Sequence, residues 1–110
     1  MQNKVKKQKA VITGMGIISP LGEKLDEYWK NLTEGVSGIG PMTLCDPSEF
    51  PSKIAGEVNT FDPYVYIDKK EAKRMARFSQ MAVASAQLAI ENANISFSKP
   101  ELDRTAVIIG

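Results

Sequence analysis

Two apolar runs, one near each end of the chain, have the pattern of buried β-strands. Residues 10–14 (AVITG) and 105–110 (TAVIIG) are almost continuously apolar, rich in β-branched residues and closed by glycine. A strand buried on both faces gives such a run, whereas a half-exposed strand alternates apolar and polar positions. We therefore predict two strands of a parallel sheet that is covered on both sides. Residues 53–58 alternate imperfectly and predict a further short strand.

Helical periodicity marks residues 24–33. Apolar positions recur there three or four residues apart and form one stripe, which consists of Leu25, Tyr28, Trp29 and Leu32. This spacing is typical of an amphipathic helix, and Gly35 is well placed to end it. We expect Trp29, as a member of the stripe, to lie in the core.

The longest predicted helix extends from Asp68 to about Ala93. Neither proline nor glycine interrupts this segment, and Asp68 and Glu71 have the spacing of a capping box. The first half of the helix carries a basic stripe. The second half is apolar nearly all round, which requires burial among several elements. We expect Phe78 in the core, and residues 94–100 should end the helix.

Together these elements predict an α/β fold that the chain does not complete by itself. Strands separated by helices favour a sheet with helices on both faces, yet the chain holds too little sequence to supply that cover. We therefore expect a piece of a larger fold, cut at a strand end. The isolated chain should be poorly soluble or molten, so sharp and dispersed amide signals in an NMR spectrum would contradict this expectation.

Composition narrows the classes of function. The 110 residues include 14 Lys and Arg, 13 Asp and Glu, one Cys and no His. A single Cys excludes an internal disulfide, and the lack of His excludes Cys/His zinc sites and Ser-His or Cys-His catalytic pairs. The near-zero net charge argues against a protein that binds nucleic acid or an anionic membrane with its whole surface. With no membrane span or secretory signal apparent, we expect a cytoplasmic chain without a metal or a cofactor.

The first apolar run continues into Gly14-x-Gly16-x-x-Ser19. Glycine-rich turns of this kind can hold a nucleotide phosphate at a helix N-terminus. Here Ser19 stands where a third glycine would be, and Pro20 delays the next helix. A tight turn at a strand end is the favoured interpretation. The alternative, a nucleotide site, predicts thermal protection by NAD or ATP.

The only cysteine, Cys45, lies in a proline-rich loop. No helix N-terminus or cation stands near it in the sequence to make the thiol reactive. We predict a semi-buried structural thiol.

Basic residues gather at the start of the long predicted helix. Five of the 14 cations lie between residues 69 and 77, and four of them form one stripe, namely Lys70, Lys73, Arg74 and Arg77. The helix macrodipole disfavours cations at this end, and an anionic partner would offset that repulsion. From charge alone, docking of an acidic partner and simple solvation are equally open. The four lysines of residues 1–9 are expected to form a solvated basic tail.

The ordered set of segments resembles the start of the β-ketoacyl-[acyl-carrier-protein] synthases. The matching segments are VITGMGIISPLG (11–22), YWKNL (28–32), GVSGI (35–39), FPSKIAGEV (50–58), FDP (61–63) and KRMARF (73–78). The resemblance is strongest to the type II condensing enzymes that elongate fatty acids, and it covers nearly the whole chain from Ala10. One departure is Ala76, where the family commonly has an acidic residue.

The resemblance implies a thiolase-like layered α-β-α-β-α fold, normally dimeric, of which residues 10–110 would be the incomplete opening part. It also implies a decarboxylative Claisen condensation of an acyl thioester with malonyl-acyl-carrier protein. The family uses one Cys and two His for this reaction, all beyond the segment present, so no catalytic residue is expected here. Basic residues in the positions of Lys70, Lys73 and Arg74 meet the acidic acyl carrier protein in the family. The alternatives are a ketosynthase segment of a polyketide synthase and a non-catalytic module that binds acyl carrier protein.

Overall fold

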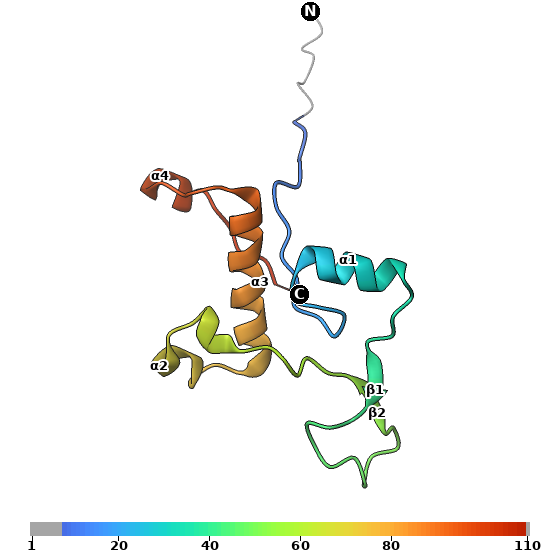
Figure 1. Cartoon of the computed structure of the whole chain (residues 1–110). Helices are drawn as coiled ribbons and strands as arrows, with labels where there is room; N and C mark the ends of the chain where they lie inside the picture. Colours follow the sequence, from blue (N-terminus) through green and yellow to red (C-terminus); the bar gives the residue numbers. More distant parts are fainter. Residues whose placement is uncertain (1–7, 110) are drawn as a thin grey trace, which may run out of the picture.

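The structure, a computed structural model, describes residues 8–109 and is an open arrangement of helices with one small sheet at its edge (Figure 1). In chain order the elements are α1 (Leu25–Thr33), β1 (Ile39–Pro41), β2 (Ile54–Gly56), η1 (Pro63–Val65, a 3-10 helix), α2 (Lys69–Ala72), α3 (Arg77–Ala93) and α4 (Lys99–Leu102). The first helix and the two-stranded sheet lie on one side of α3, while η1 and α2 lie at its N-terminal end.

The helix predicted at residues 24–33 is confirmed as α1. It ends as expected, because Gly35 takes a φ of 69°, in the left-handed region that glycine adopts without strain. Asn31 on this helix donates from Nδ2 to the carbonyl of Leu21 at 2.6 Å and fixes the preceding turn. The expectation that Trp29 lies in the core is wrong, since its side chain is 64% exposed and no residue of α1 is buried.

The single helix predicted from Asp68 to Ala93 is wrong, because the structure divides it into α2 and α3. Residues 73–75 continue α2 as a tight turn, in which the Arg74 and Met75 amides bond to carbonyls three residues back. Ala76 is then extended, with φ −66° and ψ 153°, and a new helix starts at Arg77. The predicted end is confirmed, since Asn94 adopts a left-handed conformation with φ 51°.

The two strands predicted at residues 10–14 and 105–110 are absent from the described chain. Val11, Ile12, Val107 and Ile108 are each more than 70% exposed, and the backbone of both segments is irregular. A strand needs a hydrogen-bonded neighbour, and the part of the chain that is described offers neither segment one. The parallel sheet is therefore not formed within residues 8–109.

The sheet that does form is an antiparallel pair of β1 and β2, with Ile39 opposite Gly56 and Pro41 opposite Ile54. The strand predicted at residues 53–58 is thus confirmed in its central part. Its partner β1 was not predicted, because a three-residue strand that includes glycine and proline has no readable alternation.

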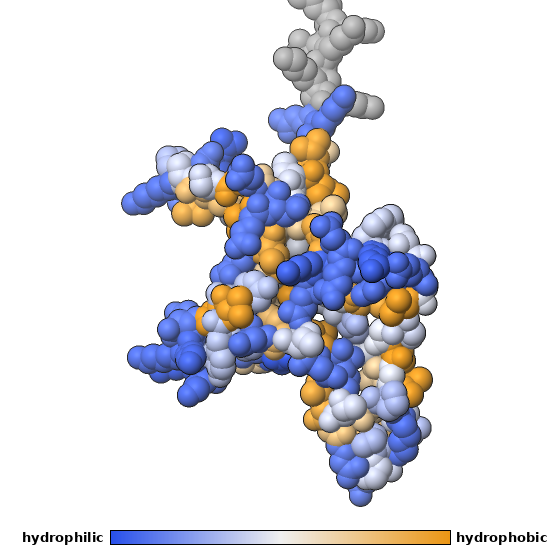
Figure 2. Space-filling view, viewed as in Figure 1, coloured by the Kyte–Doolittle hydropathy of each residue, from blue (hydrophilic) through white to orange (hydrophobic). Residues whose placement is uncertain are grey.

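The buried core is small and lies where η1, α2 and α3 meet. Its apolar members in the described residues are Phe61, Ile67, Ala72 and Ala84. Phe61 and Tyr66 stack with ring centres 6.1 Å apart. Contrary to expectation, Phe78 is 74% exposed. Apolar surface is accordingly visible between the hydrophilic regions of Figure 2, and none of the helices formed by residues 8–109 is long and apolar enough to cross a membrane.

Candidate functional site

The glycine motif after the first apolar run is a contact with α3. A Cβ atom on Gly14 would lie 2.3 Å from the Ala89 carbonyl oxygen, and one on Gly16 would lie 2.1 Å from that of Ser85. Between them, the Met15 amide donates to Asn92 Oδ1 at 3.1 Å. The two glycines therefore let the backbone approach α3 closely, as a structural turn requires.

Cys45 is exposed, so the prediction of a semi-buried thiol is wrong. The loop that carries it projects from the β1–β2 pair and is tied at its base by Glu57. The Glu57 carboxylate accepts hydrogen bonds from the backbone amides of Thr43 and Leu44 and from the Thr43 hydroxyl. These bonds, the one from Leu44 first, hold the pKa of Glu57 below its ordinary value. Within the described residues no group of side chains is suited to hold a metal ion.

The basic stripe predicted at residues 70–77 lies partly on α2, which is fixed at both ends. At its start, Asp68 Oδ1 accepts from the Lys70 amide at 2.8 Å, so the predicted N-cap is confirmed, although Glu71 does not complete a capping box. At its end, the Ala72 carbonyl accepts from Gln80 Nε2 of α3 at 2.8 Å. Ala72 itself is 1% exposed. A short helix is thereby attached rigidly to the core.

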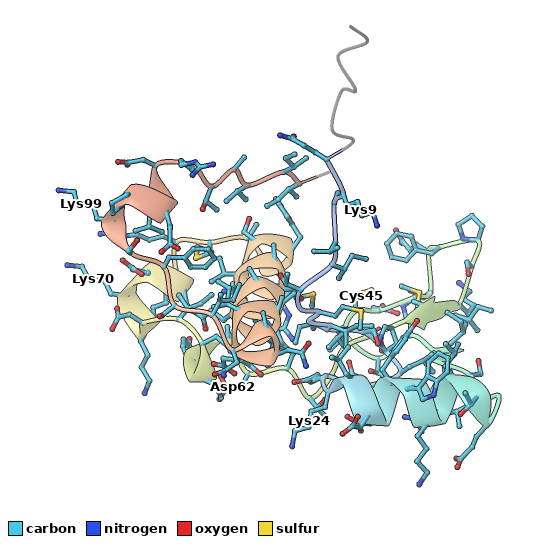
Figure 3. The ribbon with its side chains drawn as sticks, turned by 90° about the horizontal axis from the view of Figure 1, so that it is seen from above. Lys9, Lys24, Cys45, Asp62, Lys70 and Lys99 are labelled. Carbon is cyan, nitrogen blue, oxygen red and sulfur yellow. The ribbon has the colours of Figure 1, made fainter. Side chains whose placement is uncertain are left out.

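Three of the four stripe cations remain together on the surface. Lys70 lies on α2 and Lys73 caps it, while Arg74 lies in the turn that follows; all three are exposed. We call Lys70, Lys73 and Arg74 the α2 basic cluster, and Figure 3 shows that the Lys70 side chain points away from the rest of the molecule. Because α2 has only four residues and is separate from α3, the predicted conflict with a long-helix macrodipole is largely absent.

Arg77, the fourth cation of the predicted stripe, has a structural position instead. Its guanidinium donates from Nη2 to the carbonyls of Val58 and Phe61, both at 3.1 Å, and lies 4.8 Å from the centre of the Phe61 ring. These bonds join the first turn of α3 to the segment before η1. Arg77 therefore has a structural role at the start of α3 and is not part of the α2 basic cluster.

One feature beside the cluster was missed in the sequence. In η1, Tyr64 and Val65 are 46% and 72% exposed, and Lys69 Nζ lies 5.6 Å from the centre of the Tyr64 ring. Asp62 followed by Pro63 is the signal that could have revealed this element, because a capping residue before proline is typical of a helix start. Asp62 Oδ1 indeed accepts from the Tyr64 amide at 2.9 Å.

Comparison with known proteins identifies relatives along nearly the whole chain. Residues 7–110 match the family model described as "Beta-ketoacyl synthase, N-terminal domain". The chain is similar to the 3-oxoacyl-[acyl-carrier-protein] synthase 2 of Synechocystis sp., with 42% identity over 106 residues, 96% of this chain and 26% of the relative. The enzyme of the same name from Coxiella burnetii is 40% identical over the same shares of the two chains.

A solved structure has the same arrangement of elements. The ishigamide ketosynthase/chain length factor superposes with a TM-score of 0.71 and 37% sequence identity, over 78% of this chain and 21% of that chain. This likeness confirms the predicted fold class, α/β and the N-terminal portion of a thiolase-like layered fold. The chain spans about a quarter of the length of the curated relatives it matches. On the family match and these similarities, the chain belongs to the β-ketoacyl synthase family, within its N-terminal domain.

Proposed function

We propose that residues 10–110 are the incomplete opening part of a 3-oxoacyl-[acyl-carrier-protein] synthase and that residues 1–9 are a basic tail. Two relatives named as that enzyme, each at least 40% identical over 96% of the chain, support the proposal. The parent protein, meaning the longest product of the reading frame that contains this chain, would then elongate acyl chains for fatty acid synthesis.

The proposed reaction is a decarboxylative Claisen condensation. An acyl group passes to a cysteine thiolate, malonyl-acyl-carrier protein loses CO₂, and the resulting carbanion attacks the acyl thioester and releases the thiolate. The 110 residues contain no His, and Cys45 does not lie in a nucleophile motif. In this proposal the Cys-His-His set therefore lies elsewhere in the parent protein, and no residue of this chain is catalytic.

The contribution of this chain is proposed to be docking of the acyl carrier protein by Lys70, Lys73 and Arg74. The observation that carries this assignment is that three exposed cations lie on one short helix and the turn that follows it, and that this helix is capped and bonded to α3. Cations held on a rigid element steer an acidic partner and fix its orientation. Figure 3 shows Lys70 at the outer edge of the molecule, where a second protein can reach it.

The test compares two double variants of the parent protein. Lys70→Glu with Arg74→Glu should raise KM for carrier-bound substrate by about 10-fold with little change in kcat, because repulsion weakens encounter before the chemical step. Substrates on small thiols should change by less than about 2-fold, since uniform loss of partner binding does not affect them. The control, Lys24→Glu with Lys30→Glu, makes the same charge change at two exposed positions, the N-cap and the last turn of α1.

Equal losses with both substrates would mean structural damage and would contradict the docking assignment. An equal effect of the control pair would show that net charge, and not the α2 basic cluster, governs the encounter.

Two other functions keep the docking site and change the chemistry. The 37% identity to a ketosynthase/chain length factor favours, as the second candidate, a ketosynthase segment of a polyketide pathway. The third is a carrier-binding module without catalysis. Mass analysis of the carrier-bound product of the parent protein, supplied with an acyl donor and malonyl-acyl-carrier protein, distinguishes them: a single 3-oxoacyl chain two carbons longer than the donor, a poly-oxo chain from repeated condensation, or no product. We also propose a homodimer in the cytoplasm, which sedimentation of the parent protein and fractionation of cells would test.

A further inference from the structure

An apolar surface adjoins the α2 basic cluster on η1. Val65 is 72% exposed and the neighbouring Tyr64 is 46% exposed. Figure 2 shows apolar surface over η1 beside the hydrophilic surface over α2. Exposing so much of a valine side chain to water is unfavourable, so a partner that covers it gains free energy of binding. Val65 also lies next to a group of cations.

The backbone holds Val65 firmly in place. Asp62 caps η1 through the Tyr64 amide, and the Ile67 amide donates to the Pro63 carbonyl at 2.9 Å. The Tyr66 carbonyl accepts from Gln87 Nε2 of α3 at 3.0 Å, which attaches the end of η1 to the core. Because the surface is already ordered, a partner that binds to it loses little conformational entropy of this chain.

The charge around Val65 selects the kind of partner. Residues 68–74 carry four cations against Asp68 and Glu71, a net charge of +2. Lys69 lies over the Tyr64 ring with its Nζ 5.6 Å from the ring centre, so one cation of this segment lies directly against the aromatic part of the surface. An apolar centre with a charged rim is the usual anatomy of a protein interface. The fitting occupant is an acidic protein with an exposed apolar side chain.

We propose that Val65, supported by Tyr64, is the apolar contact of the acyl carrier protein docking surface, with Lys70, Lys73 and Arg74 as its charged rim. This inference rests on the proposed function. The two parts of the surface have different physical effects. The cations raise the rate of encounter and are sensitive to salt, whereas the apolar contact slows dissociation and is not.

Binding of the parent protein to fluorescently labelled acyl carrier protein, measured at several salt concentrations, tests the inference. Val65→Ser should raise Kd by about 3- to 10-fold, the loss expected for a partly buried valine side chain. The salt dependence of Kd should stay unchanged, while Lys70→Glu should reduce it. Val65→Ile keeps an apolar side chain and should bind as the unchanged protein does. The matched control is Val36→Ser, at a valine that is 47% exposed on the segment after α1.

The outcomes distinguish the apolar contact at Val65 from the proposed docking function. If Val65→Ser binds normally while Lys70→Glu weakens binding, the apolar contact is refuted and the proposed docking function survives. If neither variant changes Kd, both are refuted. If Val65→Ser lowers the melting temperature and leaves the Kd of the folded protein unchanged, Val65 is covered by the protein itself and the inference is overturned. Equally tight binding of a short DNA duplex, unaffected by Val65→Ser, would show a surface for any polyanion and would also overturn it.

Discussion

Gly16 packs so closely against α3 that no space is left for even one side-chain carbon. A Cβ there would lie 2.1 Å from the Ser85 carbonyl oxygen and 2.7 Å from the Ala89 amide nitrogen. Both are backbone atoms of a helix and cannot move aside independently. The glycine pattern that resembles a nucleotide-binding turn thus has a structural cause.

Gly16→Ala should destabilise the parent protein by about 2–3 kcal/mol, the cost of overpacking against backbone. Thermal unfolding followed by fluorescence measures the change as a lower melting temperature. Gly40→Ala is the matched control, because nothing lies within 4 Å of the position of its added Cβ. A melting temperature lowered equally by both substitutions would contradict the close contact with α3.

At the scale of elements, helix ends that depend on a single residue could be predicted from the sequence, whereas a helix break that depends on tertiary contacts could not. Asp68, Gly35 and Asn94 mark helix ends by their own conformational preferences, and all three were placed correctly. The break at Ala76 has no such signal. The new helix start is held in place by side chains of Arg77 and Gln80, which bond to carbonyls outside α3, and a periodic pattern cannot reveal such contacts.

Ala76, the one residue noted as a departure from the family pattern, occupies a helix-capping position in the structure. Ala76 is the N-cap of α3, and its side chain provides no capping bond. Ala76→Asp should therefore stabilise the protein by about 1 kcal/mol, because a short carboxylate can accept from a first-turn amide. Chemical or thermal unfolding checks this gain.

Ala76→Glu is the control for Ala76→Asp, since it adds the same charge on a side chain that is a poor N-cap. If glutamate stabilises as much as aspartate, the effect comes from charge near the α2 basic cluster. The capping explanation would then fail.

At the scale of the whole molecule, the apolar pattern predicted burial that the described residues do not provide. A groove of about 360 Å³ on α3 is lined by apolar side chains, among them Phe78, Val83, Ile90, Val107 and Ile109. The predicted strands at 10–14 and 105–110 carry the right residues for a buried sheet, but no strand of residues 8–109 pairs with them. The sequence pattern thus indicates that these segments need burial, whereas it cannot show which strands they pair with, because pairing is a tertiary contact.

The α2 basic cluster was recognisable in the sequence because charge is visible there. The separation of Arg77 from it, and the apolar neighbour on η1, became apparent only through contacts between elements. A stripe drawn on one ideal helix cannot show either feature, since both depend on the turn at residues 73–76.

We propose that, in the parent protein, the apolar face of α3 packs against further residues of the ketosynthase domain. Amide hydrogen exchange at residues 78–90 and 105–109, compared between the parent protein and the separately expressed 110 residues, tests it most directly. We predict strong protection of both segments in the parent protein and almost none in the separate chain. Equal protection in the two would mean that the 110 residues bury this face by themselves, and it would refute the proposed packing against further residues of the domain.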